Sequence, residues 1–98
     1  MPPKGFVIAQ VHEISDQAGF AKYRELVGPS VASYAGQFIV RGGQADRIEG
    51  AVPCGRVVVI EFASAAQAKA WYYSADYQAA VAVRQPVSTV EVMIVEGT

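Results

Sequence analysis

Three polar side chains lie within apolar runs of this sequence and have the chemistry that acid–base catalysis or anion binding requires. His12 is the single histidine, and imidazole is the side chain best suited to general-base catalysis near neutral pH. Glu61 lies in a strongly apolar run, and a buried, unpaired carboxyl group is suited to proton transfer. Arg41 precedes two glycines, where a guanidinium can hold a substrate carboxylate through two hydrogen bonds.

Each of these residues also has a purely structural interpretation. His12 can be a strand-end imidazole that forms a hydrogen bond at an interface, and Arg41 can form an interface salt bridge. Glu61 can pair with an arginine of a partner chain, such as Arg41 or Arg84. The chain has one histidine and one cysteine, so we expect no metal site. Nothing besides His12 supports haem ligation, and we expect no cofactor.

A second group of candidates follows along the chain. Trp71, Tyr72, Tyr73 and Tyr77 form an aromatic cluster, which either packs in the core or forms the wall of a pocket for a small planar or apolar ligand. Arg84 stands near the predicted end of a helix, where its charge complements the helix dipole. We also include it among the candidate substrate-binding residues.

The composition predicts one folded domain, residues 1–98. Apolar residues make up 52% of the 98 positions and charged residues 17%, with a net charge of -1. This excludes intrinsic disorder and gives no general field for attracting nucleic acid or a membrane. The five arginines and three lysines are scattered, so we expect no nucleic-acid partner.

The single cysteine, Cys54, excludes an intrachain disulfide. It lies in a turn rich in proline and glycine, and without a partner histidine it is a poor nucleophile. The chain contains no apolar run long enough for a signal peptide or a membrane span. We therefore expect a cytoplasmic protein that does not bind membranes.

Periodicity predicts four strands and two helical regions. Alternating or continuous apolar runs indicate the strands, and apolar residues at spacings of three and four indicate the helices. The predicted order is strand 6–13, helix 15–36, strand 37–41, strand 56–62, a helical region 64–85 that restarts at 74, and strand 89–95.

Several local features of these elements can be predicted. Ser15 is expected to cap the first helix, Pro29 to kink it, and Gly36 to end it in the left-handed conformation. Residues 44–49 are expected to continue as a bent hairpin arm. Ser64, with Gln67 three residues later, forms a capping-box pattern.

The order βαββαβ predicts an α+β, ferredoxin-like fold with a four-stranded antiparallel sheet. Right-handed crossovers place the third strand between the first and second, antiparallel to both. Both helical regions then cover the same face of the sheet. The other face must be covered by something else, and we expect a second copy of the chain to cover it.

Alternation along the strands predicts one nearly apolar face, which suits packing against helices. Gln10, His12, Arg41 and Glu61 would share the other face. Of these, His12 and Arg41 would lie at one end of the sheet about 10 Å apart, with a strand between them. Glu61 would lie near the opposite end, so the three form no triad within one chain.

Several segments in sequence resemble a bacterial family known only as domain of unknown function 1330. They include Lys4-Gly5-Phe6, the run 34–43, the run 56–62, Ala70-Trp71-Tyr72-Tyr73-Ser74 and Asp76-Tyr77-Gln78. Arg84-Gln85 and a terminal Val95-Glu96-Gly97 complete the pattern. The resemblance covers nearly the whole chain and implies the dimeric α/β-barrel group, in which two ferredoxin-like sheets pack face to face.

Two functions are consistent with these observations. The first is small-molecule binding in a pocket between sheet and helices, with activity as a cofactor-independent enzyme of monooxygenase or isomerase type by analogy of fold. His12 and Glu61 would then transfer protons, with Arg41 and Arg84 binding an anion beside the aromatic wall. The alternative is a non-catalytic dimeric module whose polar residues are interface pairs.

Overall fold

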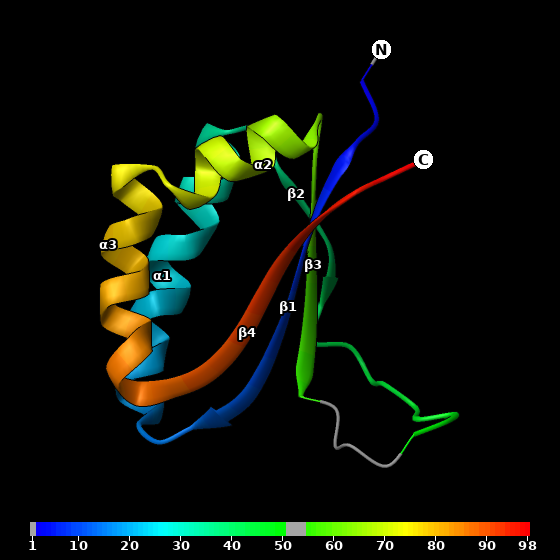
Figure 1. Cartoon of the computed structure of the whole chain (residues 1–98). Coiled ribbons are helices and arrows are strands. Elements are labelled where there is room, and N and C mark those ends of the chain that lie inside the picture. The colour runs from blue at the N-terminus through cyan, green and yellow to red at the C-terminus, as the bar shows by residue number, and fades with distance from the viewer. Residues whose placement is uncertain (1, 51–54) are drawn as a thin grey trace.

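The computed structural model describes residues 2–50 and 55–98, so the turn that contains Cys54 lies outside the described residues. Strands and helices alternate much as the periodicity predicts (Figure 1). The elements are β1 (Gly5–Ile14), α1 (Gln17–Ser33), β2 (Gln37–Arg41), β3 (Arg56–Phe62), α2 (Ala65–Tyr72), α3 (Ala75–Arg84), a 3-10 turn (Gln85–Val87) and β4 (Ser88–Glu96).

The four strands form one antiparallel sheet in the order β2-β3-β1-β4. All three helices lie on one side of this sheet (Figure 1). The α+β, ferredoxin-like prediction is therefore confirmed, including the position of the third strand between the first two. None of the helices in the described ranges is long and apolar enough to cross a membrane.

The helix ends show which local predictions were right. Ser64 and Ser74 cap α2 and α3, because each side chain accepts a hydrogen bond from the backbone N–H three residues later. The cap of α1 is Asp16 rather than Ser15, since the Asp16 carboxylate accepts from Gly19 N at 3.2 Å. The predicted cap was wrong by one residue.

The C-terminal half of α1 also differs from expectation. Pro29 does not interrupt the helix, which runs from Gln17 to Ser33, and Pro29 itself is exposed. The residue in the left-handed region is Ala35, with a φ of 57°, and not Gly36. Gly36 is needed for another reason, because a Cβ there would lie 2.6 Å from the Phe62 ring. Residues 44–49 form no strand.

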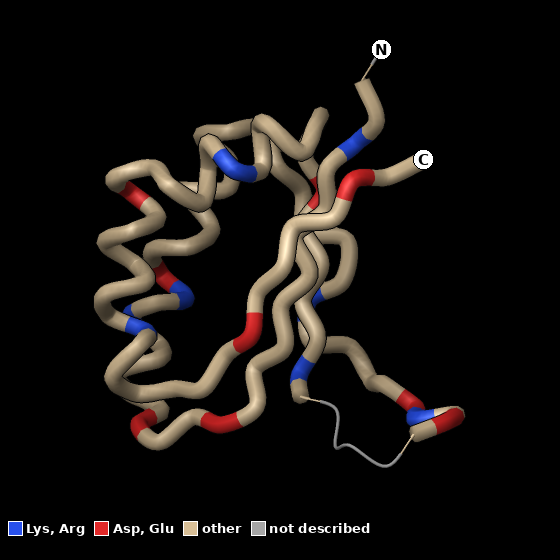
Figure 2. Tube along the Cα trace, viewed as in Figure 1, with Lys and Arg blue, Asp and Glu red and all other residues tan. Residues whose placement is uncertain are grey.

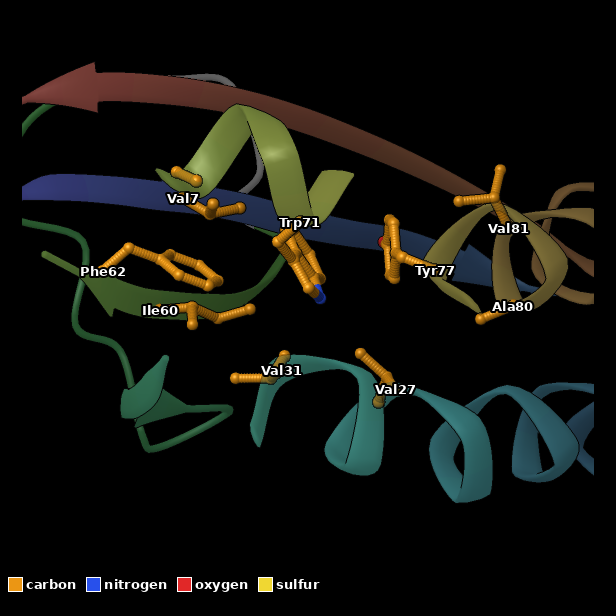
Figure 3. Close-up of a cluster of buried hydrophobic side chains, with 10 residues drawn as sticks. Val7, Val27, Val31, Ile60, Phe62, Trp71, Tyr77, Ala80 and Val81 are labelled. Atoms are coloured by element: carbon orange, nitrogen blue, oxygen red, sulfur yellow. The ribbon is translucent and has the colours of Figure 1, made fainter. Parts of the chain in front are cut away.

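The core lies between the sheet and the helices (Figure 3). Trp71 extends from α2 into this layer and is 1% exposed, with its ring centroid 5.4 Å from that of Phe62. Val27 and Val31 of α1 pack from the opposite side. This packing fixes the distance between the helices and the sheet and so positions the cavity described below.

Candidate functional site

A cavity of about 70 Å³ lies between the helices and the helix-facing side of the sheet. Its floor consists of small and β-branched residues of three adjacent strands, including Val7, Ala9, Val58, Ile60 and Val92. Such side chains face the helices because every second residue of each strand points to the same side. The floor is therefore apolar and continuous across the middle of the sheet.

Two aromatic residues of the second helical region form the wall. Trp71 and Tyr77 line the cavity with ring centroids 4.0 Å apart. The Trp71 indole N–H donates to Ser30 Oγ at 3.0 Å, which fixes the ring's orientation. Trp71 lies in the last turn of α2, and Tyr77 lies in the first turn of α3, which Ser74 caps. Trp71 and Tyr77 thus pack in the core, as one of the two alternatives had it, and the same rings line the cavity.

Tyr72, the third aromatic candidate, does not line the cavity. Its ring packs edge-on against Trp71 at 6.2 Å and lies 5.4 Å from that of Tyr77. Its backbone carbonyl accepts a hydrogen bond from Gln78 at 2.7 Å. Tyr72 therefore supports the wall from outside.

Arg84, the last residue of α3, is only 5% exposed and lines the cavity. Its Nε has no hydrogen-bond partner, and its guanidinium lies 5.5 Å from the centre of the Tyr23 ring. No ion pair joins it to a carboxylate within residues 2–50 and 55–98. A buried guanidinium without a carboxylate partner is unusual, because desolvation of the charge is costly.

Tyr23 separates Arg84 from the aromatic wall. Its hydroxyl forms a 2.9 Å hydrogen bond with the hydroxyl of Tyr77. Burial raises the pKa of Tyr23 well above its ordinary value, Tyr77 raises it further, and Arg84 partly offsets the rise. Tyr23 is therefore a neutral hydrogen-bonding group in the cavity at physiological pH.

Arg41 corrects an expectation from the sequence. Simple alternation placed it on the same face as His12, but the pairing of β2 with β3 shifts register between Phe38 and Val40. Arg41 consequently pairs with Val58, a floor residue, and lines the cavity. The predicted face was wrong because a β-bulge adds one residue and reverses the alternation beyond it.

Two further arginines, Arg24 and Arg56, line the cavity and are exposed. Arg56 crosses over Gly42, where any Cβ would collide with its guanidinium and where φ is +71°. Among the described residues that line the cavity, four are arginines and none is a carboxylate or histidine. The site thus has an apolar interior and a basic group of side chains, Arg24, Arg41, Arg56 and Arg84.

Sequence reasoning missed Tyr23, Arg24 and Arg56 as site residues. Tyr23 fits the three- and four-residue apolar spacing of the first helix, and that spacing does not show what its hydroxyl contacts. Arg56 alternates with Val58 and Ile60, so its position on the helix-facing side was available from the strand pattern. Nothing in the sequence distinguishes Arg24 from other exposed residues of the helix.

His12 and Glu61 lie outside the cavity, on the opposite face of the sheet. The His12 Nε2 is 3.4 Å from a Glu91 carboxylate oxygen, and a Glu61 carboxylate oxygen is 3.4 Å from Lys4 Nζ. His12 stands at a register shift between β1 and β4. The structure therefore brings Arg41, Trp71, Tyr77 and Arg84 together and leaves the two acid–base candidates elsewhere.

The described residues contain no group of three or more histidine, cysteine, aspartate and glutamate side chains that could hold a metal ion. The cavity itself offers nitrogen donors that are already protonated. Its lining combines apolar side chains with the hydrogen-bond donors and positive charge of four arginines.

A family model described as Domain of unknown function (DUF1330) matches residues 4–98. No curated protein sequence matches the chain.

Solved structures show the same fold. A protein of unknown function from Rhodopseudomonas palustris, RPA0582, is 15% identical with a TM-score of 0.76 and is aligned over 100% of this chain and 85% of its own. SnoaB, a cofactor-independent oxygenase from Streptomyces nogalater, is 10% identical with a TM-score of 0.61 over 97% and 93%. A dimeric ferredoxin-like protein of unknown function from Thermobifida fusca is 15% identical with a TM-score of 0.54 over 98% and 92%.

Proposed function

The chain belongs to the family described as Domain of unknown function (DUF1330), and from that premise we propose that it binds a small organic molecule in the cavity between sheet and helices. The observation that supports this most is the cavity itself, an apolar space walled by Trp71 and Tyr77. Apolar walls with a few convergent polar groups are typical of small-molecule sites.

The size of the cavity limits the ligand. A dry, apolar cavity of about 150 Å³ admits benzene, whereas this one measures about 70 Å³. The ligand is therefore a molecule of few heavy atoms, or one ring whose entry displaces exposed side chains such as Arg24 and Arg56. Arg41 and Arg84 are its proposed polar contacts, with Trp71 and Tyr77 its apolar contacts.

We further propose that two copies of the chain associate through the open face of the sheet. Val40, Val59, Ile8 and Met93 form an apolar row across all four strands of that face. Met93 is 58% exposed in the single chain, and an apolar row of this kind needs a cover. A solved structure with this fold, from Thermobifida fusca, is described as dimeric.

Catalysis of a cofactor-independent oxygenase or isomerase type is a second candidate, supported by the shared fold of SnoaB. It has less support than binding, because neither His12 nor Glu61 lines the cavity. Proton transfer by these two residues would require a separate site on the open face of the sheet.

The alternative, a non-catalytic module whose polar residues are interface pairs, suits His12 and Glu61 better than Arg41 and Arg84. The first two have partners on the open face, Glu91 and Lys4. The two arginines lie on the helix side of the sheet, where a sheet-to-sheet contact would not reach them. This difference favours ligand binding.

Native mass spectrometry of the purified protein, followed by denaturing spectrometry, tests the proposal. We expect a dimer that carries an extra mass and loses it on denaturation. Ala9→Leu fills the cavity floor and should abolish the adduct, whereas the control Ala79→Leu, on the exposed side of α3, should retain it. An adduct that survives Ala9→Leu would contradict the cavity assignment, and a monomer would contradict the dimer.

A further inference from the structure

We infer that the ligand of this cavity is a small organic carboxylate, whose anionic group binds beside Arg84 and whose apolar part lies against Trp71. The inference rests on the proposed binding function and adds the chemical class of the ligand. It depends on the charges around the cavity, an observation independent of its apolar wall.

The first step concerns Arg84 itself. Its side chain is nine-tenths buried, its Nε has no hydrogen-bond partner, and it lines the cavity. Tyr23, its neighbour, is held neutral by burial and cannot supply a counter-charge. The guanidinium interacts with the neutral Tyr23 hydroxyl, but its Nε donor has no partner and its charge is not balanced by a carboxylate, so an anion in the cavity would complement both.

The second step is the collection of like charges. Arg24 comes from α1, Arg41 from β2, Arg56 from β3 and Arg84 from α3, and all four line one cavity. None forms an ion pair in the described part of the chain. Figure 2 shows basic positions on the helices and on the two strands, on either side of the layer between them. Four arginines around one cavity give it a positive potential that favours an anion.

The third step concerns the exposed arginines Arg41 and Arg24, each of which lies against an aromatic ring. Arg41 stacks over Phe38 with its Cζ 4.0 Å from the ring centre, and Arg24 lies 4.9 Å from the Phe20 ring. Stacking leaves the edges of a guanidinium, which carry the N–H donors, free for a planar acceptor. A carboxylate can accept two parallel hydrogen bonds from the N–H donors along one edge of a guanidinium.

The fourth step assigns the rest of the ligand. The floor residues Val7 and Ile60, with Trp71 at the wall, form the apolar end of the cavity. A free inorganic anion would leave that end empty, whereas a carboxylate attached to a short chain or one ring would fill it. An organic acid therefore fits both ends of the cavity better than inorganic phosphate.

Trp71 provides a direct assay, because it is the only tryptophan and lines the cavity. The change in its fluorescence is titrated with benzoate and butyrate, and separately with benzamide and butyramide, which have nearly the same shape without the charge. We expect each acid to bind about 10- to 100-fold more tightly than its amide.

Arg84→Met keeps the length of the side chain and removes the charge, and it should abolish the preference for the acids. Arg41→Gln, at an exposed position that does not endanger folding, should weaken it. Lys22→Met removes a charge from the exposed side of α1 and should leave the preference unchanged. The midpoint of urea unfolding of Arg84→Met should not fall, because the substitution removes an uncompensated buried charge.

The outcomes separate the inference from the function on which it rests. Acids and amides that bind equally well would overturn the carboxylate assignment and leave small-molecule binding intact. Failure of all four probes to change Trp71 fluorescence would contradict both. An acid preference that persists in both Arg84→Met and Arg41→Gln would also overturn the assignment.

Discussion

The charged side chains on the two faces of the sheet differ in whether they have a partner of opposite charge. On the open face, Glu61 has Lys4 within 3.4 Å and His12 has Glu91 within 3.4 Å, and one side chain of each pair, Lys4 and Glu91, is well exposed. On the helix-facing side, Arg84 is buried and the arginines have no carboxylate among the described residues that line the cavity.

This difference separates structural from ligand-directed charges. An exposed pair is satisfied by its partner and by water, so it contributes little and requires no ligand. A buried guanidinium without a carboxylate is costly and persists where it has a use beyond folding. His12 and Glu61, the acid–base candidates from the sequence, have charged neighbours on the open face and do not line the cavity.

The largest expected effect concerns the wall of the cavity. Trp71→Ala should destabilise the fold by about 3–5 kcal/mol, since it removes a large buried ring. Met93→Ala, on the open face, should change the stability of the single chain by less than about 0.5 kcal/mol. Urea unfolding at low protein concentration measures both. Similar losses for the two variants would contradict the contrast between the faces.

The next effect concerns the apolar row of the open face. Met93→Asp places a charge in this row, at its β4 end, and should weaken dimerisation at least about 100-fold, or about 2.7 kcal/mol. Sedimentation velocity measures the dissociation constant, and Ala79→Asp on the helix side of the molecule serves as the control. A Met93→Asp dimer as tight as the wild type would show that copies do not meet through this face.

A third prediction uses Tyr23. Because its pKa is raised in the folded state, its neutral form contributes stability that is present below about pH 10 and lost as the pH rises above it. The slope should reach about 1.4 kcal/mol per pH unit.

Tyr23→Phe should reduce this alkaline slope, whereas Tyr73→Phe should not, because Tyr73 is 74% exposed. Urea unfolding between pH 8 and 11 measures the slopes. Equal slopes in the wild type and Tyr23→Phe would mean that the Tyr23 hydroxyl is not held neutral by the fold.

The smallest expected effects come from the open-face charges. His12→Gln and Glu61→Gln should each change stability by less than about 0.5 kcal/mol. Both variants should leave the response of Trp71 fluorescence to benzoate unchanged, because neither residue lines the cavity. Loss of benzoate binding in His12→Gln would restore this residue as a site candidate.

The elements themselves were largely predictable. Burial of side chains produces the apolar run of β3 and the spacing of Phe20, Tyr23 and Val27 in α1. Such patterns can be recognised from the order of residues in the sequence alone. The serine caps of α2 and α3 are local as well, since each involves a backbone N–H three residues away. Local interactions need no knowledge of distant segments.

Trp71, Tyr77, Arg41 and Arg84 were candidates from residue type, but their grouping around one cavity was not predicted. Alternation placed Arg41 with His12, and the bulge in β2 moved it to the other face of the sheet. Arg84 was interpreted by its place at a helix end, which says nothing about its burial. The pocket residues of α1 were missed because a helix face does not reveal what lies opposite.

The sequence by itself determined the order of strands and helices, the antiparallel sheet and the need to cover its second face, because hydrophobic periodicity and connection handedness are properties of the chain. Only the tertiary structure decided which charged side chains line the same cavity. That result depends on the register of β2 against β3 and on the packing of α1 against α3. These contacts join residues far apart in the chain, and no local pattern encodes them.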